Sequence, residues 1–241
     1  MLNSSSSSLH VAIVGAGVIG AMSVWRLARR GIEVTLFDRY APAHDRSATG
    51  GESRIFRVAC KEGARHVPLV RESLAMWREL ESETDRLLLY QTGVATISAA
   101  HASGMRAIRE TAAQFDLRLE ALERDLASER FPAVPSRARR DDAVRSRRRR
   151  AALRSRGASA VALGANLRTY TSVDAIESFD DHVALRISGA KQTFFHVVMA
   201  PGGWASFDPA LAALPLVTRR ISLGWFAPRS PSATTSRTRS C

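Results

Sequence analysis

The chain has 241 residues, 45% of them hydrophobic, and a formal net charge of +12 at pH 7. This length suits one large or two small domains, and the apolar content is typical of a globular protein. Residues 137–156 contribute +8 and residues 229–241 contribute +3, which leaves +1 for the remainder and excludes a uniformly basic protein.

Cysteine and histidine usage argues against disulfides and metal binding. Cys60 and Cys241 lie far apart without a C-x-x-C pair, and the six histidines show no metal-ligand spacing. The serine-rich lead, residues 1–10, lacks the apolar core of a signal peptide, and no apolar run is long enough to span a membrane. We therefore expect a disordered lead on a soluble, cytoplasmic protein without a metal.

Residues 11–38 read as one βαβ unit. An apolar run at 11–14 predicts a buried parallel strand, a helix follows to about Arg30, and residues 33–37 predict the second strand. Gly15, Gly17 and Gly20 have G-x-G-x-x-G spacing between the first strand and the helix. These glycines permit a tight turn, close approach of a pyrophosphate and close packing of the helix on the strand.

Asp38 ends the second predicted strand, 18 residues after Gly20, where a carboxylate can accept both hydroxyls of an adenosine ribose. The complete context predicts a dinucleotide site, and the residues alone leave NAD and FAD open. The acid disfavours a 2′-phosphate, although Arg39 directly after it keeps NADP in consideration.

Residues 41–57 are rich in small and turn-forming side chains, so we expect a loop that passes beside the cofactor. Arg54 and Arg57 are three residues apart, and one helical turn would place both on the same side. Two guanidinium groups there could hold a carboxylate.

The remaining periodic stretches predict three helices and several short strands. Apolar spacing predicts helices at 67–80, 105–115 and 119–130, with strands at 87–90 and 94–97. Alternating residues then predict strands at 167–171, 173–179, 182–188 and 192–199, followed by a glycine turn at 201–204. We expect an antiparallel meander that leads back into a parallel sheet, with the glycine turn beside the cofactor.

Several stretches in order resemble the D-amino-acid-oxidase-like flavoproteins, and within them the monomeric sarcosine oxidases and N-methyltryptophan oxidases. They read GAGVIGAM, FDRYAPAH, SRIFR, HVPLVRESLAMWRELE, TGV and GGWAS. The resemblance favours FAD over NAD. It implies an enzyme that oxidises the C–N bond of a secondary or N-methyl amino acid, with oxygen as electron acceptor and release of peroxide.

The resemblance also implies site residues. It places His44, Ser53 and Arg54 beside FAD. It also places Val173 at the adenine end of the cofactor and Gly202 in the turn that touches the cofactor. It assigns Arg57 to the substrate carboxylate. Arg57 and Arg54, which lies beside FAD, are therefore the candidate catalytic residues. The full cofactor set comprises Gly15, Gly17, Gly20, Asp38, Arg39, His44, Ser53, Arg54, Val173 and Gly202.

The implied fold is α/β, with a Rossmann-like, glutathione-reductase-type FAD domain and an incomplete antiparallel-sheet substrate domain. We expect the FAD domain at residues 11–60 and 160–212, and the partial substrate domain at 61–134 and 213–228. Family members continue well beyond this length, to a flavin-bonding cysteine and a lysine that completes the carboxylate clamp. We therefore expect a truncated chain with little or no turnover.

Two arginine-rich stretches depart from the resemblance. Residues 135–159 and 229–241 consist mainly of Arg, Ala and Ser, without an apolar stripe, so we expect a disordered insert and a non-native tail. A GC-rich gene read out of frame would give this composition. The functional alternative is a nucleic-acid-binding arm around Arg147–Arg150, which lacks interleaved aromatic residues.

Overall fold

The computed structural model describes residues 9–42, 44, 46–48, 50, 53–59, 63–91, 94–97, 102–131, 143–146, 149–152 and 164–220. The chain divides into two compact units. Unit 1 comprises residues 1–52 and 153–222, and unit 2 comprises residues 53–152 and 223–241. The expected lead before residue 9, the tail at 229–241 and both cysteines lie outside the described residues.

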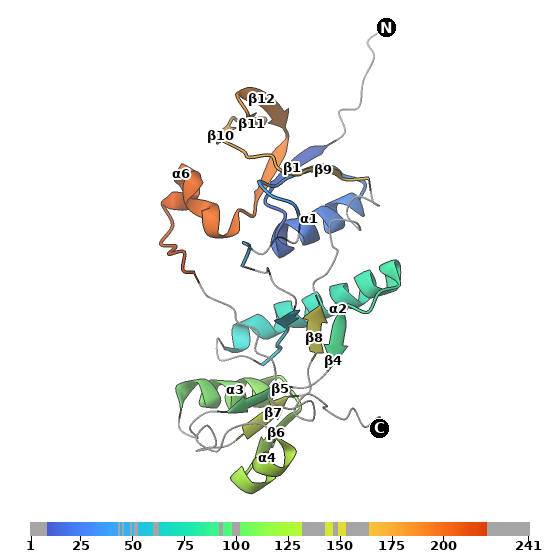
Figure 1. Ribbon diagram of the computed structural model, residues 1–241, viewed down its shortest axis with the longest axis vertical. Helices are drawn as coiled ribbons and strands as arrows, with labels where there is room; N and C mark the ends of the chain where they lie inside the picture. The colour runs from blue at the N-terminus through green and yellow to red at the C-terminus, as the bar shows by residue number, and fades with distance from the viewer. Residues whose placement is uncertain are drawn as a thin grey trace, which may run out of the picture. The chain divides into compact units, whose positions relative to one another are not determined.

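Unit 1 is built on a four-stranded parallel sheet (Figure 1). Its strands are β1 (His10–Val14), β2 (Glu33–Phe37), β9 (Asn166–Arg168) and β13 (His196–Met199), in the order β13-β1-β2-β9. Ala12 and Ile13 in β1 have no exposed surface, as the apolar run at 11–14 predicts for a central parallel strand. Strand β2 pairs with β1 on one side and β13 pairs with it on the other. The direction in which the chain crosses the sheet therefore reverses at β1.

Helix α1 (Val18–Ala28) joins β1 to β2 and buries Val24 and Trp25. It ends two residues before the expected position at Arg30, and Gly31 follows with φ +72°. A positive φ is costly for a side-chain-bearing residue, which explains the glycine at this exit. The βαβ unit predicted from the sequence is confirmed.

An antiparallel meander packs against one face of the parallel sheet in unit 1. Strands β10 (Ala175–Ser178), β11 (Val183–Ile187) and β12 (Ala190–Phe194) pair in sequence order, and then β13 enters the parallel sheet. Buried side chains of both sheets form one core cluster, made of Ala12, Val14, Phe37, Val173, Leu185, Ile187 and Phe194. The stretch predicted as a single strand at 192–199 is therefore two strands, which separate at Phe195 and belong to different sheets.

The chain continues from β13 into the 3-10 helix η3 (Gly202–Phe207) and the short helix α6 (Pro209–Ala212). The Asp208 carboxylate caps α6, because it accepts hydrogen bonds from the backbone N–H groups of Ala210 and Leu211. The glycine turn expected at 201–204 thus opens a helical segment directly after the carboxyl end of β13.

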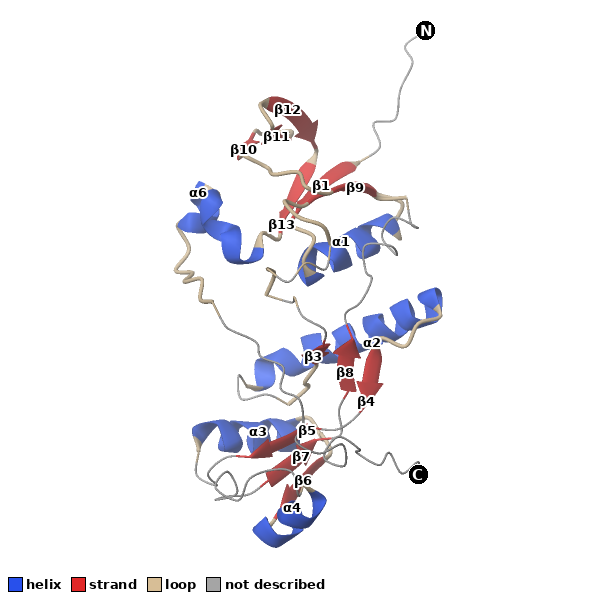
Figure 2. Ribbon diagram, viewed as in Figure 1, coloured by secondary structure: helices blue, strands red, loops and turns tan. Residues whose placement is uncertain are grey.

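The described part of unit 2 contains helices and two three-stranded sheets (Figure 2). Its helices are η1 (Ala64–His66), α2 (Val67–Thr84), α3 (Ser103–Gln114) and α4 (Arg124–Arg130). The first sheet is β3 (Ser53–Ile55), β8 (Arg149–Ala152) and β4 (Leu89–Gln91); the second is β5 (Val94–Ile97), β7 (Ala143–Ser146) and β6 (Leu119–Leu122). Met105 and Ile108 of α3 form a core with Ala59.

Unit 2 differs from the expectations in two stretches. The helix expected at 119–130 is strand β6 followed by α4, because Leu119–Leu122 pairs with β7 and Glu123 takes an extended conformation. Strands β7 and β8 lie within residues 135–159, for which we expected disorder. Their ladders rest on backbone hydrogen bonds, which do not require an apolar face. The rest of that stretch lies outside the described residues.

Candidate dinucleotide-binding site

The three glycines after β1 occupy positions with different steric demands. Gly15 has φ +104°, and a Cβ there would lie 2.2 Å from the carbonyl oxygen of Ala200. Its N–H donates to the carbonyl of Phe37 at 2.8 Å, which ties the loop to the end of β2. A Cβ at Gly20 would lie 1.8 Å from the carbonyl oxygen of Gly15, whereas a Cβ at Gly17 would meet nothing within 4 Å. The loop therefore has no space for a side chain at Gly15 or Gly20, but it has space beside Gly17.

Gly17 is also the N-cap residue of α1, and it has no side chain to accept hydrogen bonds from the helix. The first N–H groups of an α-helix lack partners within the helix, and the helix dipole is positive at this end. An anion that approaches the open side of Gly17 meets these donors directly. The loop and helix together have the form of a phosphate-binding turn.

Asp38 follows β2 directly and is 7% exposed. One carboxylate oxygen accepts from the backbone N–H of Ala16 at 2.6 Å, and the other accepts from the N–H of Tyr40 at 2.7 Å. The imidazole Nε2 of His44 lies 3.8 Å from the Asp38 carboxylate. A carboxylate offers about four acceptor positions, so both oxygens can still accept from a ligand hydroxyl.

A cavity of about 450 Å³ lies at the carboxyl edge of the parallel sheet. It is bounded by the glycine loop, the end of β2 and its following loop, the turn after β9, and the segment from β13 to α6. Its volume is within the roughly 300–1,000 Å³ typical of small-molecule sites, and its position is where open α/β sheets bind ligands. Among the expected site residues, those that line it are Gly15, Gly17, Asp38, Arg39, His44, Val173 and Gly202.

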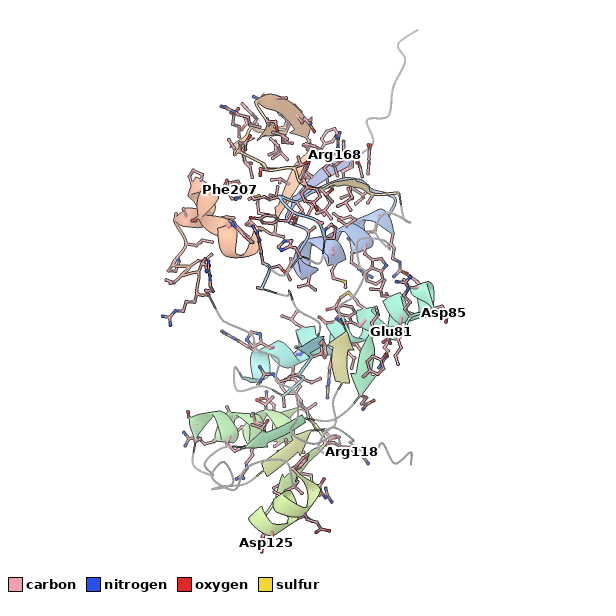
Figure 3. The ribbon with its side chains drawn as sticks, in the orientation of Figure 1. Glu81, Asp85, Arg118, Asp125, Arg168 and Phe207 are labelled. Atoms are coloured by element: carbon pink, nitrogen blue, oxygen red, sulfur yellow. The ribbon has the colours of Figure 1, made fainter. Side chains whose placement is uncertain are left out.

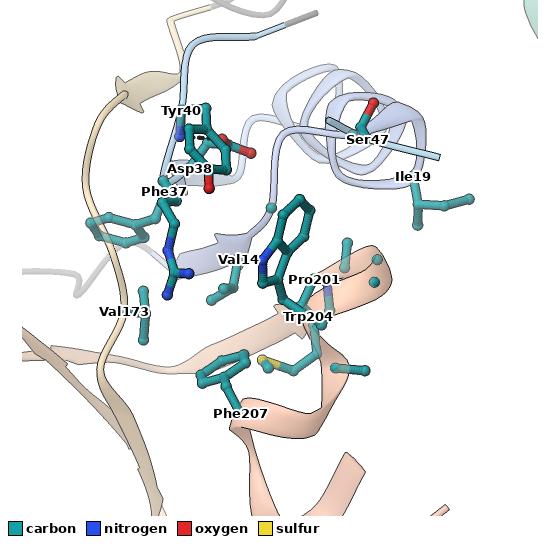
Figure 4. Close-up of a pocket in the computed structure, with 18 of the residues that line it drawn as sticks. Val14, Ile19, Phe37, Asp38, Tyr40, Ser47, Val173, Pro201, Trp204 and Phe207 are labelled. Carbon is teal, nitrogen blue, oxygen red and sulfur yellow. Dashed lines mark hydrogen bonds between the residues drawn. The ribbon is translucent and has the colours of Figure 1, made fainter. Parts of the chain in front are cut away.

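An aromatic group from two segments borders this cavity. Tyr40 and His44 meet edge to face with ring centroids 4.8 Å apart, and Trp204 lies 5.9 Å from Tyr40 and 6.3 Å from His44. Figure 4 shows the Trp204 ring projecting from the turn after β13 toward the end of β2, where Asp38 and Tyr40 lie. The resemblance places His44 beside FAD, and the glycine turn at 201–204 that we expected beside the cofactor contains Trp204. Tyr40 is not among the predicted residues, although it lies in the FDRYAPAH stretch.

The remaining predicted site residues are divided between the two units. Val173 is 7% exposed and packs in the core cluster, while Gly202 opens η3 with φ +57°. Ser53 and Arg54 belong to β3 in unit 2, and Arg57 follows that strand with an exposed side chain. The structure thus brings the glycine loop, Asp38, His44 and the adenine-end residues together in unit 1, while Ser53, Arg54 and Arg57 belong to unit 2.

The described part of the chain contains no group of three or more His, Cys, Asp or Glu side chains arranged to hold a metal ion. None of its helices combines the length and apolarity required to cross a membrane.

The sequence profile of the family "FAD dependent oxidoreductase" matches residues 10–239. The chain is 28% identical over 237 residues to a monomeric sarcosine oxidase of Bacillus sp. (strain B-0618), which covers 92% of this chain and 58% of that relative. It is 29% identical over 122 residues to an N-methyl-L-tryptophan oxidase of Salmonella newport (strain SL254), covering 51% of this chain and 33% of the relative. The chain thus spans less than two thirds of the length of either relative.

Solved structures give the same fold. A glycine oxidase from Geobacillus kaustophilus matches with a TM-score of 0.70 and 24% identity, over 86% of this chain and 58% of that one. NikD, an amino acid oxidase of nikkomycin biosynthesis, matches with a TM-score of 0.69 and 23% identity, over 83% and 53%. Together with a profile match over nearly the whole chain, the cavity at the carboxyl edge of a Rossmann-like sheet leads to one assignment: the chain belongs to the FAD dependent oxidoreductase family.

Proposed function

We propose that this chain binds FAD through the cavity of unit 1, and that the protein oxidises the C–N bond of a secondary or N-methyl amino acid with oxygen as electron acceptor. The observation that carries the cofactor part is the open side of Gly17 at the N-terminus of α1, with Asp38 beside the same cavity. The names of the sarcosine and N-methyltryptophan oxidases support the substrate class.

The residues of unit 1 fit the adenosine diphosphate part of FAD. The backbone N–H groups at the start of α1 would hold the pyrophosphate, because no Cβ occupies the space beside Gly17. The Asp38 carboxylate, already fixed by Ala16 and Tyr40, would accept the ribose hydroxyls. Val173 would pack against adenine as a buried apolar surface at the cavity wall.

When bound, FAD supplies the acceptor for the two electrons that leave the C–N bond. The chain's own residues would bind and orient the amino acid. On the resemblance to the sarcosine oxidases we assign Arg57, which is exposed in unit 2, to the substrate carboxylate. A guanidinium can donate two parallel hydrogen bonds to such a group. We assign Ser53 and Arg54 of β3 to the flavin end of the cofactor.

Titration of the purified chain with FAD, followed by flavin fluorescence, tests the cofactor assignment. We expect saturable binding by the parent and its loss in Gly17→Val, because the added side chain would fill the space for the pyrophosphate, and its Cβ would meet no protein atom within 4 Å. Ala190→Val, at an exposed position of β12, is the matched control and should bind as the parent does. Equal FAD binding by the parent and Gly17→Val would overturn the assignment.

The substrate class is tested by spectral change of the bound flavin on addition of sarcosine or N-methyltryptophan. We expect a saturable change in the parent that Arg57→Met weakens at least tenfold, because loss of a charged, two-point contact costs roughly 1.5–3 kcal/mol. Arg65→Met is the control, since Arg65 is also an exposed arginine of unit 2. An equal response in the Arg57 and Arg65 variants would remove Arg57 from the substrate site.

A further inference from the structure

Two residues that are far apart in sequence meet at one end of the cavity. The Nε group of Arg39, directly after Asp38, donates to the hydroxyl of Ser172 at 3.1 Å. Arg39 and Ser172 both line the cavity, together with the buried Val173. The hydrogen bond uses the inner nitrogen of the guanidinium, so the two terminal nitrogens remain available to a ligand.

The turn that carries Ser172 is held in place by backbone hydrogen bonds that do not involve the Ser172 side chain. The N–H of Thr171 donates to the carbonyl of Asp38 at 2.8 Å, and the N–H of Tyr170 donates to the carbonyl of Tyr40 at 3.4 Å. The N–H of Asp38 in turn donates to the carbonyl of Arg168 at 3.0 Å. Removal of the Ser172 hydroxyl should therefore leave the turn where it is and release only the Arg39 side chain.

We propose that Ser172 is a positioning residue that holds the Arg39 guanidinium as one wall of the adenine-binding end of the cavity. This inference rests on the proposed binding of FAD. With Asp38 at the ribose and the glycine loop at the pyrophosphate, the base lies beyond the acid, where Ser172 and Val173 line the cavity. A planar guanidinium stacks well on an aromatic face, and fixing its Nε orients that plane before the ligand arrives.

The Arg39–Ser172 pair also leads us to predict which adenine nucleotide the site prefers. Arg39 would recognise the purine face, which every adenine dinucleotide carries, and would give no gain to a phosphate on the ribose 2′-oxygen. The nearby Asp38 carboxylate opposes such a phosphate by charge repulsion. The site should therefore prefer 5′-ADP over 2′,5′-ADP.

Calorimetric titration of the full chain with 5′-ADP tests the proposal. Base stacking is worth about 1–3 kcal/mol, so Arg39→Ala should weaken binding by roughly tenfold. Ser172→Ala should weaken it about three- to fivefold, and the double variant should be no weaker than Arg39→Ala alone, because the hydroxyl acts only through the guanidinium. Ser172→Thr, which keeps the hydroxyl, should restore binding.

Ser23→Ala is the matched control, since Ser23 is an exposed serine of unit 1 whose hydroxyl donates to the Ile19 carbonyl within α1. Its 5′-ADP affinity should equal that of the parent, and the urea midpoint of Ser172→Ala should equal that of Ser23→Ala. Independent losses that multiply in the double variant would overturn the positioning role. Tighter binding of 2′,5′-ADP than of 5′-ADP, lost in Arg39→Ala, would show that Arg39 recognises a phosphate instead. A parent that binds neither FAD nor 5′-ADP would refute the proposed function itself.

Discussion

A Cβ at Gly20 would lie 1.8 Å from the carbonyl oxygen of Gly15, so the first turn of α1 packs on the glycine loop without room for a side chain. The contact is with backbone, which cannot rotate away as a flexible side chain can. The shape of the phosphate-binding turn therefore depends on Gly20, although Gly20 itself does not line the cavity.

We predict that Gly20→Ala destabilises unit 1 strongly, by about 2–4 kcal/mol, because α1 must shift away from β1 to relieve the overlap. Urea denaturation followed by circular dichroism measures this loss. Gly17→Ala is the matched control: its added methyl group meets nothing within 4 Å, so its unfolding midpoint should stay close to that of the parent. A stable Gly20→Ala would show that the loop and helix are less tightly coupled than the structure indicates.

Asp38→Asn should lower both stability and FAD affinity. The carboxylate accepts from the N–H groups of Ala16 and Tyr40, and an amide oriented to accept one of them turns its NH₂ toward the other. One unsatisfied buried donor costs about 1–3 kcal/mol, which urea denaturation can resolve.

Asp174→Asn is the control for this change. The Asp174 carboxylate also accepts from a backbone N–H, that of Ser188 at 3.0 Å, but Asp174 is exposed and water can replace the bond. The Asp174 variant should therefore lose less stability than the Asp38 variant and should keep its FAD affinity. Equal losses of stability in the two variants would contradict the role given to Asp38.

Glu81 near the end of α2 should give unit 2 a pH-dependent stability. Burial by itself raises the pKa of this carboxyl, but hydrogen bonds from the Leu89 N–H, from Arg78 and from the Leu88 N–H outweigh it and lower the pKa below its ordinary 4.5. The N–H groups lie 2.6 Å and 2.8 Å from the same Glu81 oxygen, for Leu89 and Leu88 respectively. Figure 3 shows Glu81 one turn before Asp85, where the helix ends.

Because the folded-state pKa is lowered, the ionised Glu81 stabilises the fold fully above the unfolded pKa, and this contribution is lost as the pH falls through the folded value. We predict that the parent loses stability on acidification below about pH 4.5. In Glu81→Gln, stability should depend less steeply on pH over this range. Urea midpoints between pH 3 and pH 7 measure it, with the exposed Glu72→Gln of the same helix as control. Parallel slopes for the parent and Glu81→Gln would contradict the prediction.

Leu185→Ala should destabilise unit 1 by about 2–5 kcal/mol, the usual cost of truncating a buried leucine. Leu185 in β11 has no exposed surface and belongs to the core cluster that joins the meander to the parallel sheet. Leu214→Ala, with a side chain that is 49% exposed, serves as the control and should change the urea midpoint little. If both variants unfold at the same urea concentration, the meander is not packed on the sheet as described.

Local pattern predicted the βαβ unit well, because each of its parts has a local physical cause. The apolar run of β1, the glycine spacing and the acid at the end of β2 depend on residues within one short stretch. Pattern failed where a distant partner decides the structure. Leu119–Leu122 is a strand because β7 pairs with it, and residues 192–199 divide at Phe195, whose N–H donates to the carbonyl of His10.

The sequence by itself determined the family likeness, the glycine turn and its acid, since spacing along one chain segment is enough to specify a phosphate-binding turn. Only the tertiary structure decided which distant residues share the cavity with them. Trp204 reaches Tyr40, and Ser172 reaches Arg39 across 133 residues, because parallel strands bring their carboxyl ends to a common edge. Contacts of that kind are set by sheet order, β13-β1-β2-β9, and sheet order is not a property of any local stretch of sequence.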